Sequence, residues 1–256
     1  MSEVPGRACL AGKVVLVAGG GAGIGVGGAG RGGRAGGDVV GMGRGTAAAA
    51  LLTGQAGSCA YLPGDVTVDS DWQRIIASLR DRWGRLDALV NSAGVSVLQT
   101  YEQMAVERAR EMMRINVLGS VLGMKHAIPL MRASGGGCVV NIASVAALRR
   151  APGNGAYAAS KAAIARLSHL MNREYSVGKP AVRVDVVHPG LIWGDSVAAA
   201  FGSEGAEAIR AMVLAATPLG RVGSPEDISW IVEYLVSRGG VGSDSGMVID
   251  GGLRFG

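Results

Sequence analysis

The chain alternates between short apolar runs and longer helix-like stretches. The first run, Lys13-Val-Val-Leu-Val-Ala18, is apolar at successive positions, which is typical of a strand buried on both faces of a parallel sheet. Runs of this kind predict strands over residues 13–18, 38–42, 58–62, 86–91, 137–143, 182–188 and 246–250. The stretches between them predict helices over residues 70–83, 104–133, 157–178 and 224–238.

This alternation predicts an α/β fold, in which a doubly wound, parallel, seven-stranded sheet carries helices on both faces. We expect one domain over residues 1–256. Ligands of such sheets bind beyond the carboxyl ends of the strands. The residues that end or follow predicted strands are therefore expected to converge there, and they include Gly19, Asn91, Ser144 and Pro189.

The segment after the first strand departs from the usual composition of a helix that packs on a sheet. Between Val26 and Gly37, glycine occupies seven of twelve positions. Each glycine in a helix interior costs about 1 kcal/mol relative to alanine, and the face towards the sheet lacks bulky side chains. We therefore expect residues 26–37 to form the helix that is least protected from hydrogen exchange.

Composition argues against several classes of protein. No apolar run reaches the 18 residues of a membrane span, and Met1–Leu10 lacks the apolar core of a signal peptide. The basic residues behind the net charge of +5 are scattered and only 4% of residues are aromatic, so no nucleic-acid partner is expected. Cys9, Cys59 and Cys138 lack metal-binding spacing, so we expect no metal and reduced thiols in the cytoplasm.

A glycine-rich turn, Gly19-Gly-Gly-Ala-Gly23-Ile-Gly25, follows the first predicted strand directly. A strand, a glycine turn and a helix start place bare amide N–H groups and a positive dipole end where a pyrophosphate can bind. Glycine is needed because a Cβ atom would block the approach of the backbone to the phosphates. The position of this turn, more than its composition, predicts a dinucleotide site.

Tyr157 and Lys161 lie four residues apart, so both side chains project from one face of a helix. A nearby ammonium favours the phenolate and should lower the pKa of Tyr157 towards the range of a useful general acid/base. Ser144 ends the apolar run Cys138–Ser144 and can donate a hydrogen bond to the oxygen that Tyr157 protonates. A lone Y-x-x-x-K pair is common by accident, but here the glycine turn accompanies it.

These motifs resemble those of the short-chain dehydrogenase/reductase family, and the resemblance extends over nearly the whole chain. The family's T-G-x-x-x-G-x-G turn matches Ala18–Gly25, with alanine in place of threonine. Its N-N-A-G segment appears as Asn91-Ser-Ala93-Gly94, and its P-G turn as Pro189-Gly190. The resemblance is nearest to hydroxysteroid and secondary-alcohol dehydrogenases.

The resemblance implies a Rossmann-fold oxidoreductase whose catalytic residues are Asn116, Ser144, Tyr157 and Lys161. Hydride would pass between NAD(P)(H) and a carbonyl or alcohol carbon, while Tyr157 exchanges the proton and Ser144 orients the oxygen. Lys161 would stabilise the phenolate and bond the nicotinamide ribose, and Asn116 would hold a water that relays protons. The implied cofactor-binding residues are Gly19, Ala22, Gly23, Ile24, Gly25, Arg44, Asp65, Val66, Asn91, Ala93, Gly94, Tyr157, Lys161, Pro189, Gly190 and Ile192.

The end of the second strand bears on the choice between NADP and NAD. NAD-preferring relatives generally place an acid there, whereas this chain has Gly43 and then Arg44. A guanidinium can bind a 2′-phosphate through charge-assisted hydrogen bonds, which favours NADP. The alternative is that Arg44 only begins a loop. Asp65 is likewise expected to contact the adenine, or else to cap a turn.

The expected substrate is a hydrophobic ketone or secondary alcohol. Residues 192–216 predict a lid, and the residues expected to give a largely apolar pocket are Ser96, Val97, Leu148, Trp193, Val197 and Phe201. The family often has threonine at the position of Gly194, where it contacts the carboxamide. Asp195 or Ser196 would have to supply that contact here.

Two alternatives stay open. A 3-oxoacyl-thioester reductase would need a basic patch for its acidic carrier protein, which could come from Arg132, Arg149, Arg150 and Arg173. A non-catalytic dinucleotide sensor would be signalled by loss of the tyrosine or the lysine, and both are present. Relatives usually assemble as tetramers through the helices near 104–133 and 157–178, so a homotetramer is expected, with a dimer as the alternative.

Overall fold

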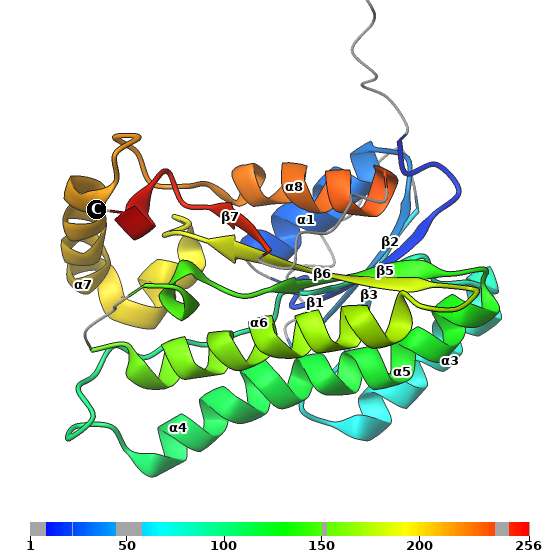
Figure 1. Ribbon diagram of the computed structural model, residues 1–256, viewed down its shortest axis with the longest axis horizontal. Coiled ribbons are helices and arrows are strands. Elements are labelled where there is room, and N and C mark those ends of the chain that lie inside the picture. The colour runs from blue at the N-terminus through cyan, green and yellow to red at the C-terminus, as the bar shows by residue number, and fades with distance from the viewer. Residues whose placement is uncertain (1–8, 22, 45–57, 150–152, 239–245, 256) are drawn as a thin grey trace, which may run out of the picture.

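The structure is a computed structural model, and it describes residues 9–21, 23–44, 58–149, 153–238 and 246–255. Its centre is a parallel sheet of seven strands in the order β3-β2-β1-β4-β5-β6-β7 (Figure 1). This confirms the predicted fold class, and each strand lies within two residues of its expected range. The strands are β1 (Val14–Ala18), β2 (Asp38–Gly43), β3 (Cys59–Pro63), β4 (Ala88–Asn91), β5 (Gly137–Ile142), β6 (Val182–Pro189) and β7 (Met247–Ile249).

The predicted helices are also present, with one subdivision and one addition. The single helix expected over 104–133 is divided by a π-helical turn at Arg114–Leu118, and the expected lid contains a helix, α7. None of the described helices is both long enough and apolar enough to span a bilayer. The helices are α1 (Gly23–Arg34), α3 (Asp69–Trp83), α4 (Val106–Met113), α5 (Gly119–Ala133), α6 (Gly155–Tyr175), α7 (Asp195–Ala216) and α8 (Pro225–Arg238).

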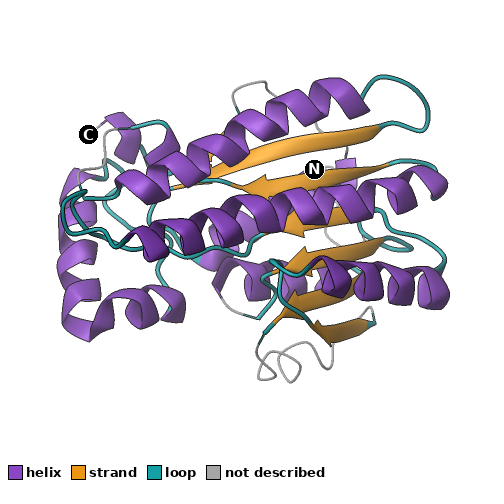
Figure 2. Cartoon of the chain, turned by 90° about the horizontal axis from the view of Figure 1, so that it is seen from below, coloured by secondary structure: helices purple, strands orange, loops and turns teal. Residues whose placement is uncertain are grey.

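The helices form two layers, one on each face of the sheet. In Figure 1, α1 and α8 lie above the strands and α3, α5 and α6 below, and Figure 2 shows the second group covering its face. Successive residues of β1 alternate between the two resulting cores. Leu16 joins the core under α3 and α5, whereas Val15 and Val17 join the core under α1 and α8. Burial on both faces explains why the strands are apolar at successive positions.

The chain reverses its direction of winding between β3 and β4, since β4 pairs with the free side of β1. The turn after β1 therefore lies beside the turn after β4. Gly19 has a left-handed backbone (φ 84°), and a Cβ atom there would lie only 2.5 Å from the amide nitrogen of Ala93. This contact marks the switch point of the sheet, where open α/β folds bind their ligands.

Close packing accounts for some of the glycines of α1. A Cβ atom on Gly25 would lie 2.1 Å from the carbonyl oxygen of Gly19, and one on Gly32 would lie 2.9 Å from Cγ2 of Val39. At Gly28, by contrast, no atom lies within 4 Å of an added Cβ. The helix runs from Gly23 to Arg34, three residues earlier at each end than expected, and its weak hydrogen-exchange protection stays a prediction.

These two environments predict opposite effects of the same substitution. Gly28→Ala should stabilise the protein by about 1 kcal/mol, because alanine has the higher helix propensity and meets open space. Gly25→Ala should destabilise it by roughly 1–3 kcal/mol, because the methyl group overlaps a backbone carbonyl. Urea unfolding measures both free energies, and equal stabilities of the two variants would contradict the packing described here.

Candidate active site

Three of the four expected catalytic side chains meet at the carboxyl edge of the sheet. Tyr157 and Lys161 occupy the first two turns of α6, and Ser144 follows β5. The side chain of Ser144 hydrogen-bonds the phenol of Tyr157. Nζ of Lys161 lies 5.8 Å from the centroid of the Tyr157 ring, on the same helix face as expected.

Ser144 is held by its own backbone in a way that fixes its hydrogen-bonding direction. It caps the 3₁₀ turn Val145–Ala147, and its Oγ accepts a hydrogen bond of 3.2 Å from the backbone N–H of Ala146. Because an amide can only donate, this bond uses a lone pair of Oγ and leaves the hydroxyl hydrogen available. Ser144 can therefore donate to the phenol oxygen of Tyr157 or to a substrate oxygen.

Asn116 is buried in the π-helical turn, which interrupts the α-helical hydrogen-bond pattern between α4 and α5. Its Oδ1 accepts from the amide of Val95 at 2.8 Å, and its Nδ2 donates to the carbonyl of Val95 at 2.9 Å. Nδ2 also donates to Oγ of Ser160 at 2.9 Å. The side chain thus holds the segment after β4 against α6. Its role towards a relay water stays a prediction.

Gly94 leaves open space beside Lys161 and Asn116. It is exposed, and a Cβ atom there would lie 3.2 Å from Nζ of Lys161 and 3.4 Å from Oδ1 of Asn116. A side chain at this position would fill the space over the lysine. The absence of one leaves room for a group that contacts the ammonium, as the expected nicotinamide ribose would.

The electrostatics of the pair differ from the expectation. Burial raises the pKa of the Tyr157 phenol, and the hydrogen bond from Ser144 only partly opposes this. Burial also lowers the pKa of Lys161 to about 8. The expected lowering of the tyrosine pKa by lysine is therefore wrong for this structure, because burial has the larger effect and Nζ of Lys161 donates to the carbonyl of Ile142 at 2.8 Å.

The turn after β1 suits an anionic group. Helix α1 begins at Gly23, so the amides of Gly23, Ile24 and Gly25 have no acceptor within the helix, and no acidic residue lies in the first turn. The amides of Gly19 and Gly20 are used by the fold itself, since both donate to the carbonyl of Met42, at 2.9 and 3.1 Å. A pyrophosphate fits this donor set. Ala22, expected in the same turn, lies outside the described residues.

At the adenine end of the expected cofactor site, the side chains of Asp65 and Val66 already make contacts within the protein. Oδ1 of Asp65 accepts from both the amide and the hydroxyl of Thr67, each at 2.8 Å, so this oxygen does cap a turn. An adenine contact would have to use the other oxygen. Val66 is buried against Gly119, which leaves its backbone as the part that could reach a ligand.

Arg44 is exposed at the end of β2, directly after Gly43. A Cβ atom on Gly43 would lie 2.6 Å from the hydroxyl oxygen of Tyr61 on β3. An acidic residue at Gly43 would therefore require the Tyr61 hydroxyl, the far end of that side chain, to move. The end of β2 thus lacks the carboxylate of NAD-preferring relatives and carries an exposed arginine instead.

The side chain of Asn91 bonds to a neighbouring strand and does not point towards the expected cofactor site. It is buried, and its Nδ2 donates to Oδ1 of Asn141 on β5 at 2.8 Å, while Asn141 donates to Oγ of Ser168 on α6 at 2.9 Å. Only the backbone of Asn91 and of Ala93 after it is left to contact a cofactor. Asn141 and Ser168 were missed by sequence reasoning, although a polar residue inside an apolar strand was an available sign for Asn141.

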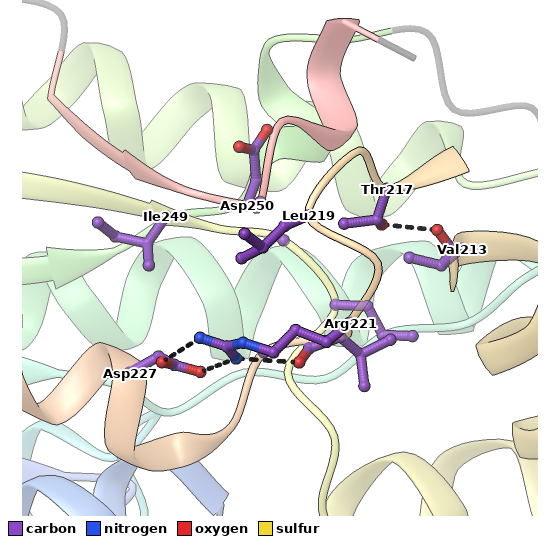
Figure 3. A pocket seen from close by; sticks show the side chains of 12 residues that line it. Val213, Thr217, Leu219, Arg221, Asp227, Ile249 and Asp250 are labelled. Atoms are coloured by element: carbon purple, nitrogen blue, oxygen red, sulfur yellow. Dashed lines mark hydrogen bonds and ion pairs between the residues drawn. The ribbon is translucent and has the colours of Figure 1, made fainter. Parts of the chain in front are cut away.

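The turn after β6 is tied to the C-terminal part of the chain. Gly190 donates to the carbonyl of Ile249 on β7 at 2.8 Å, and Ile192 pairs with Gly223 through a short parallel bridge. The pocket in Figure 3 lies between this turn and the end of α7, where Arg221 forms a two-bond ion pair with Asp227 (2.8 and 2.9 Å). Neither Ser144 nor Tyr157 lines it, so this pocket is separate from the phenol.

The expected lid is a helix with a break. Within α7, Gly202 leaves the helical conformation (φ 71°, ψ 166°). The guanidinium of Arg210 lies 5.3 Å from the ring of Trp193, so the second half of α7 packs back on the start of the segment. Figures 1 and 2 place α7 beyond the carboxyl ends of the strands. The side chains of Asp195, Ser196 and Phe201 lie outside what the structure describes.

Comparison with known proteins gives consistent matches over nearly the whole chain. A family model described as enoyl-(acyl carrier protein) reductase matches residues 19–254. The 2-(S)-hydroxypropyl-CoM dehydrogenase 3 of Xanthobacter autotrophicus is 34% identical over 251 residues, which cover 95% of this chain and 97% of the relative. The NADP-dependent (R)-specific alcohol dehydrogenase of Lentilactobacillus kefiri is 31% identical, with 95% and 97% covered.

A solved structure agrees with these relatives. The structure of a short-chain type dehydrogenase/reductase from Mycobacterium ulcerans superposes with a TM-score of 0.87 at 32% identity. It covers 96% of this chain and 91% of that chain. The fold and the sequence motifs therefore lead to the same group of proteins.

The buried ammonium of Lys161 should cost stability. Its folded pKa of about 8 lies below the ordinary value of 10.5, so the unfolded chain binds more protons between these values and wild-type stability rises with pH across that window. Lys161→Met should therefore stabilise the protein at pH 7 by about 2–3 kcal/mol. The gain should fall to less than half by pH 10.

Urea unfolding at pH 7 and pH 10 measures this difference, with the exposed Lys179→Met as the control. The control should change stability by less than about 0.5 kcal/mol at either pH. A Lys161→Met protein that is no more stable than the wild type at pH 7 would show that the burial of the ammonium is compensated.

Proposed function

The chain belongs to the short-chain dehydrogenase/reductase family, and we propose that it transfers hydride between NADP(H) and a hydrophobic ketone or secondary alcohol. As its relatives are dehydrogenases, it is an oxidoreductase that acts on CH–OH donors. The observation that carries the finer proposal is the hydrogen bond from Ser144 to the phenol of Tyr157, beside Lys161 and the open face of Gly94.

The proton chemistry follows from these contacts. Burial keeps the phenol of Tyr157 protonated at rest, so in ketone reduction it can give its proton to the substrate oxygen. The phenolate left behind would be stabilised by the hydroxyl of Ser144. When bound, the nicotinamide cofactor would supply or accept the hydride. Gly19, Gly23–Gly25 and Gly94 are the places where the backbone would admit it.

Tyr157→Phe tests the proposed acid directly. Turnover should fall by about 10²–10⁴-fold, the usual contribution of general acid–base catalysis, with the fold unchanged. Absorbance of NADPH and NADH, followed separately across a panel of ketones and secondary alcohols, measures the rate. Tyr175→Phe, at the far end of the same helix, is the matched control and should keep full activity.

Unchanged turnover in Tyr157→Phe would favour the alternative of a dinucleotide sensor that does no chemistry. A wild-type protein that binds NADPH but converts no member of the panel would point the same way. Loss of activity in both tyrosine variants would instead indicate a general effect on α6.

NADP is the favoured cofactor for two reasons. Arg44 is exposed directly after β2, and Gly43 before it carries no carboxylate that would repel a 2′-phosphate. The alcohol dehydrogenase of Lentilactobacillus kefiri, a relative at 31% identity, is named as NADP-dependent. The alternative that Arg44 only begins a loop keeps NAD open.

Arg44→Ala should show whether Arg44 binds the 2′-phosphate of NADP or only begins a loop. Loss of a charge-assisted hydrogen bond is worth about 1.5–3 kcal/mol, so the Kd for NADPH should rise roughly tenfold or more while that for NADH stays within about twofold. Quenching of protein fluorescence gives both constants. Arg80→Ala, on the exposed side of α3, removes the same charge elsewhere and should change neither. Equal losses for the two cofactors would refute the phosphate contact.

The hydrophobic substrate and the lid role of residues 192–216 rest on thinner support. Leu148, near Ser144, is partly exposed, and Trp193 leads into α7 beside the same edge of the sheet. Both are consistent with an apolar substrate that is covered by α7. The relatives are named for different alcohols, so the substrate panel described above decides the class.

The 3-oxoacyl-thioester alternative loses support from the arrangement of its basic residues. Helix α6 runs antiparallel to the strands, because Lys161 contacts the end of β5 and Asn172 bonds Val184 near the start of β6. Arg173 therefore lies about 24 Å from Tyr157 along the helix. Arg132 stacks on Tyr175 at that same far end, and Arg150 lies outside the described residues. Of the described arginines of this set, Arg132 and Arg173 therefore lie away from the phenol, whereas Arg149 follows Ser144 by only five residues.

We also propose a homotetramer built through α5, α6 and β7, and a cytoplasmic location. The support for assembly is the family resemblance together with exposed apolar side chains, such as Leu170 on α6 and Leu118 in the π-helical turn before α5. Sedimentation equilibrium measures the assembly. The support for the location is that Cys9, Cys59 and Cys138 are all free thiols, as in a reducing compartment.

A further inference from the structure

His188, near the end of β6, makes a buried contact that the proposed chemistry does not use. Its side chain is fully buried, and its Nδ1 lies 3.0 Å from the main-chain carbonyl oxygen of Ser144. Since a carbonyl oxygen can only accept, Nδ1 must carry the proton and donate. Burial lowers the pKa of His188, which favours the neutral ring. Nε2 is then a bare acceptor, and no group in the described residues donates to it.

The imidazole of His188 lies where the pairing between β5 and β6 ends. The paired register of β5 and β6 stops at Ile142 and Val187, and the last bond runs from the amide of Ala143 to the carbonyl of Val187 (2.8 Å). The next residue of β6 after the histidine is Pro189, which has no N–H to extend the ladder. The ring of His188 therefore provides the next donor from β6 to the chain that leaves β5.

The other edge of the His188 ring, which carries Cδ2 and Nε2, faces Gly246. Gly246 lies against it with a left-handed backbone (φ 76°), and a Cβ atom there would lie 3.0 Å from both Cδ2 and Nε2 of His188. Glycine at this position therefore leaves the space that the imidazole fills, and the ring is fully buried. The direction of the Nδ1–H bond is therefore set by packing.

The consequence reaches the hydroxyl of Ser144. The carbonyl of this residue accepts from His188 and from the amide of Ala147 (3.1 Å), and its Oγ accepts from the amide of Ala146 (3.2 Å). We propose that His188 is a positioning residue: its Nδ1–H fixes the main chain of Ser144 and so directs the Ser144 hydroxyl towards Tyr157 and the substrate oxygen. This inference rests on the proposed oxidoreductase function.

Two amide substitutions provide a matched test. In His188→Asn the side-chain N–H can take the place of Nδ1–H, whereas in His188→Gln it takes the place of the Nε2 edge and cannot reach the carbonyl of Ser144. His188→Asn should keep kcat within about threefold of the wild type. His188→Gln should lower kcat roughly tenfold to a hundredfold, with the KM for NADPH changed less than about threefold.

Two further measurements separate positioning from loss of stability. In a Ser144→Ala background, His188→Gln should have little further effect on kcat, because the hydroxyl it directs is gone. The acidic limb of the pH profile for alcohol oxidation, where activity rises as Tyr157 ionises, should move to higher pH in His188→Gln and in Ser144→Ala alike, since Ser144 lowers the pKa of Tyr157. Lys161, the charged group beside the phenol of Tyr157, is unchanged in both variants.

Val187→Ala is the control for a general weakening of β6. Val187 is buried in the core under α1 and α8. This variant should therefore lose stability but keep the wild-type pH profile and kcat. Equal kcat in the wild type and both amide variants would overturn the inference, as would losses that follow stability alone in all three variants. A wild-type protein with no turnover would overturn the proposed function as well, so the two failures can be distinguished.

Discussion

The candidate site depends on buried hydrogen bonds that tie the ends of the strands to one helix. Asn116 holds the segment after β4 to Ser160 on α6, and Asn141 joins β4, β5 and α6 through Asn91 and Ser168. Each of these polar groups would cost about 1–3 kcal/mol if it were buried without its partner. The network therefore favours one arrangement of α6, and with it one position of the phenol and the ammonium.

Burial also sets the electrostatic character of the site. It destabilises the ionised forms of both Tyr157 and Lys161, in opposite directions of pKa. The phenol of Tyr157 keeps its proton, and Lys161 loses its proton at a lower pH than an exposed lysine. At rest the pair is therefore close to the neutral acid and the cation that ketone reduction requires. Groups that stabilise an ion formed during reaction are most effective where water is excluded. The same exclusion makes the lysine costly to the fold, which is a common conflict between stability and function.

Local patterns in the sequence were enough for much of this description. The strands follow from apolar runs because a two-sided sheet buries every position, and the Tyr157–Lys161 pair follows from helix geometry. The direction of the tyrosine pKa was not accessible, because it depends on the depth of burial and on where Nζ points. Contacts such as that between His188 and Ser144 were missed for a similar reason: they join residues 44 positions apart, and a single histidine in an apolar strand gives no sign of its partner.

The glycines of α1 show how local and tertiary requirements separate. Gly19 and Gly25 touch across the turn, and this contact brings the start of α1 directly over the end of β1. The proposed dinucleotide site would need that close approach, which Gly25 allows at the expense of helix propensity. Gly28 has open space around its Cα and meets no such requirement. The low intrinsic stability of this helix is therefore only partly a consequence of function, and its packing against α8 and the sheet must hold the remainder.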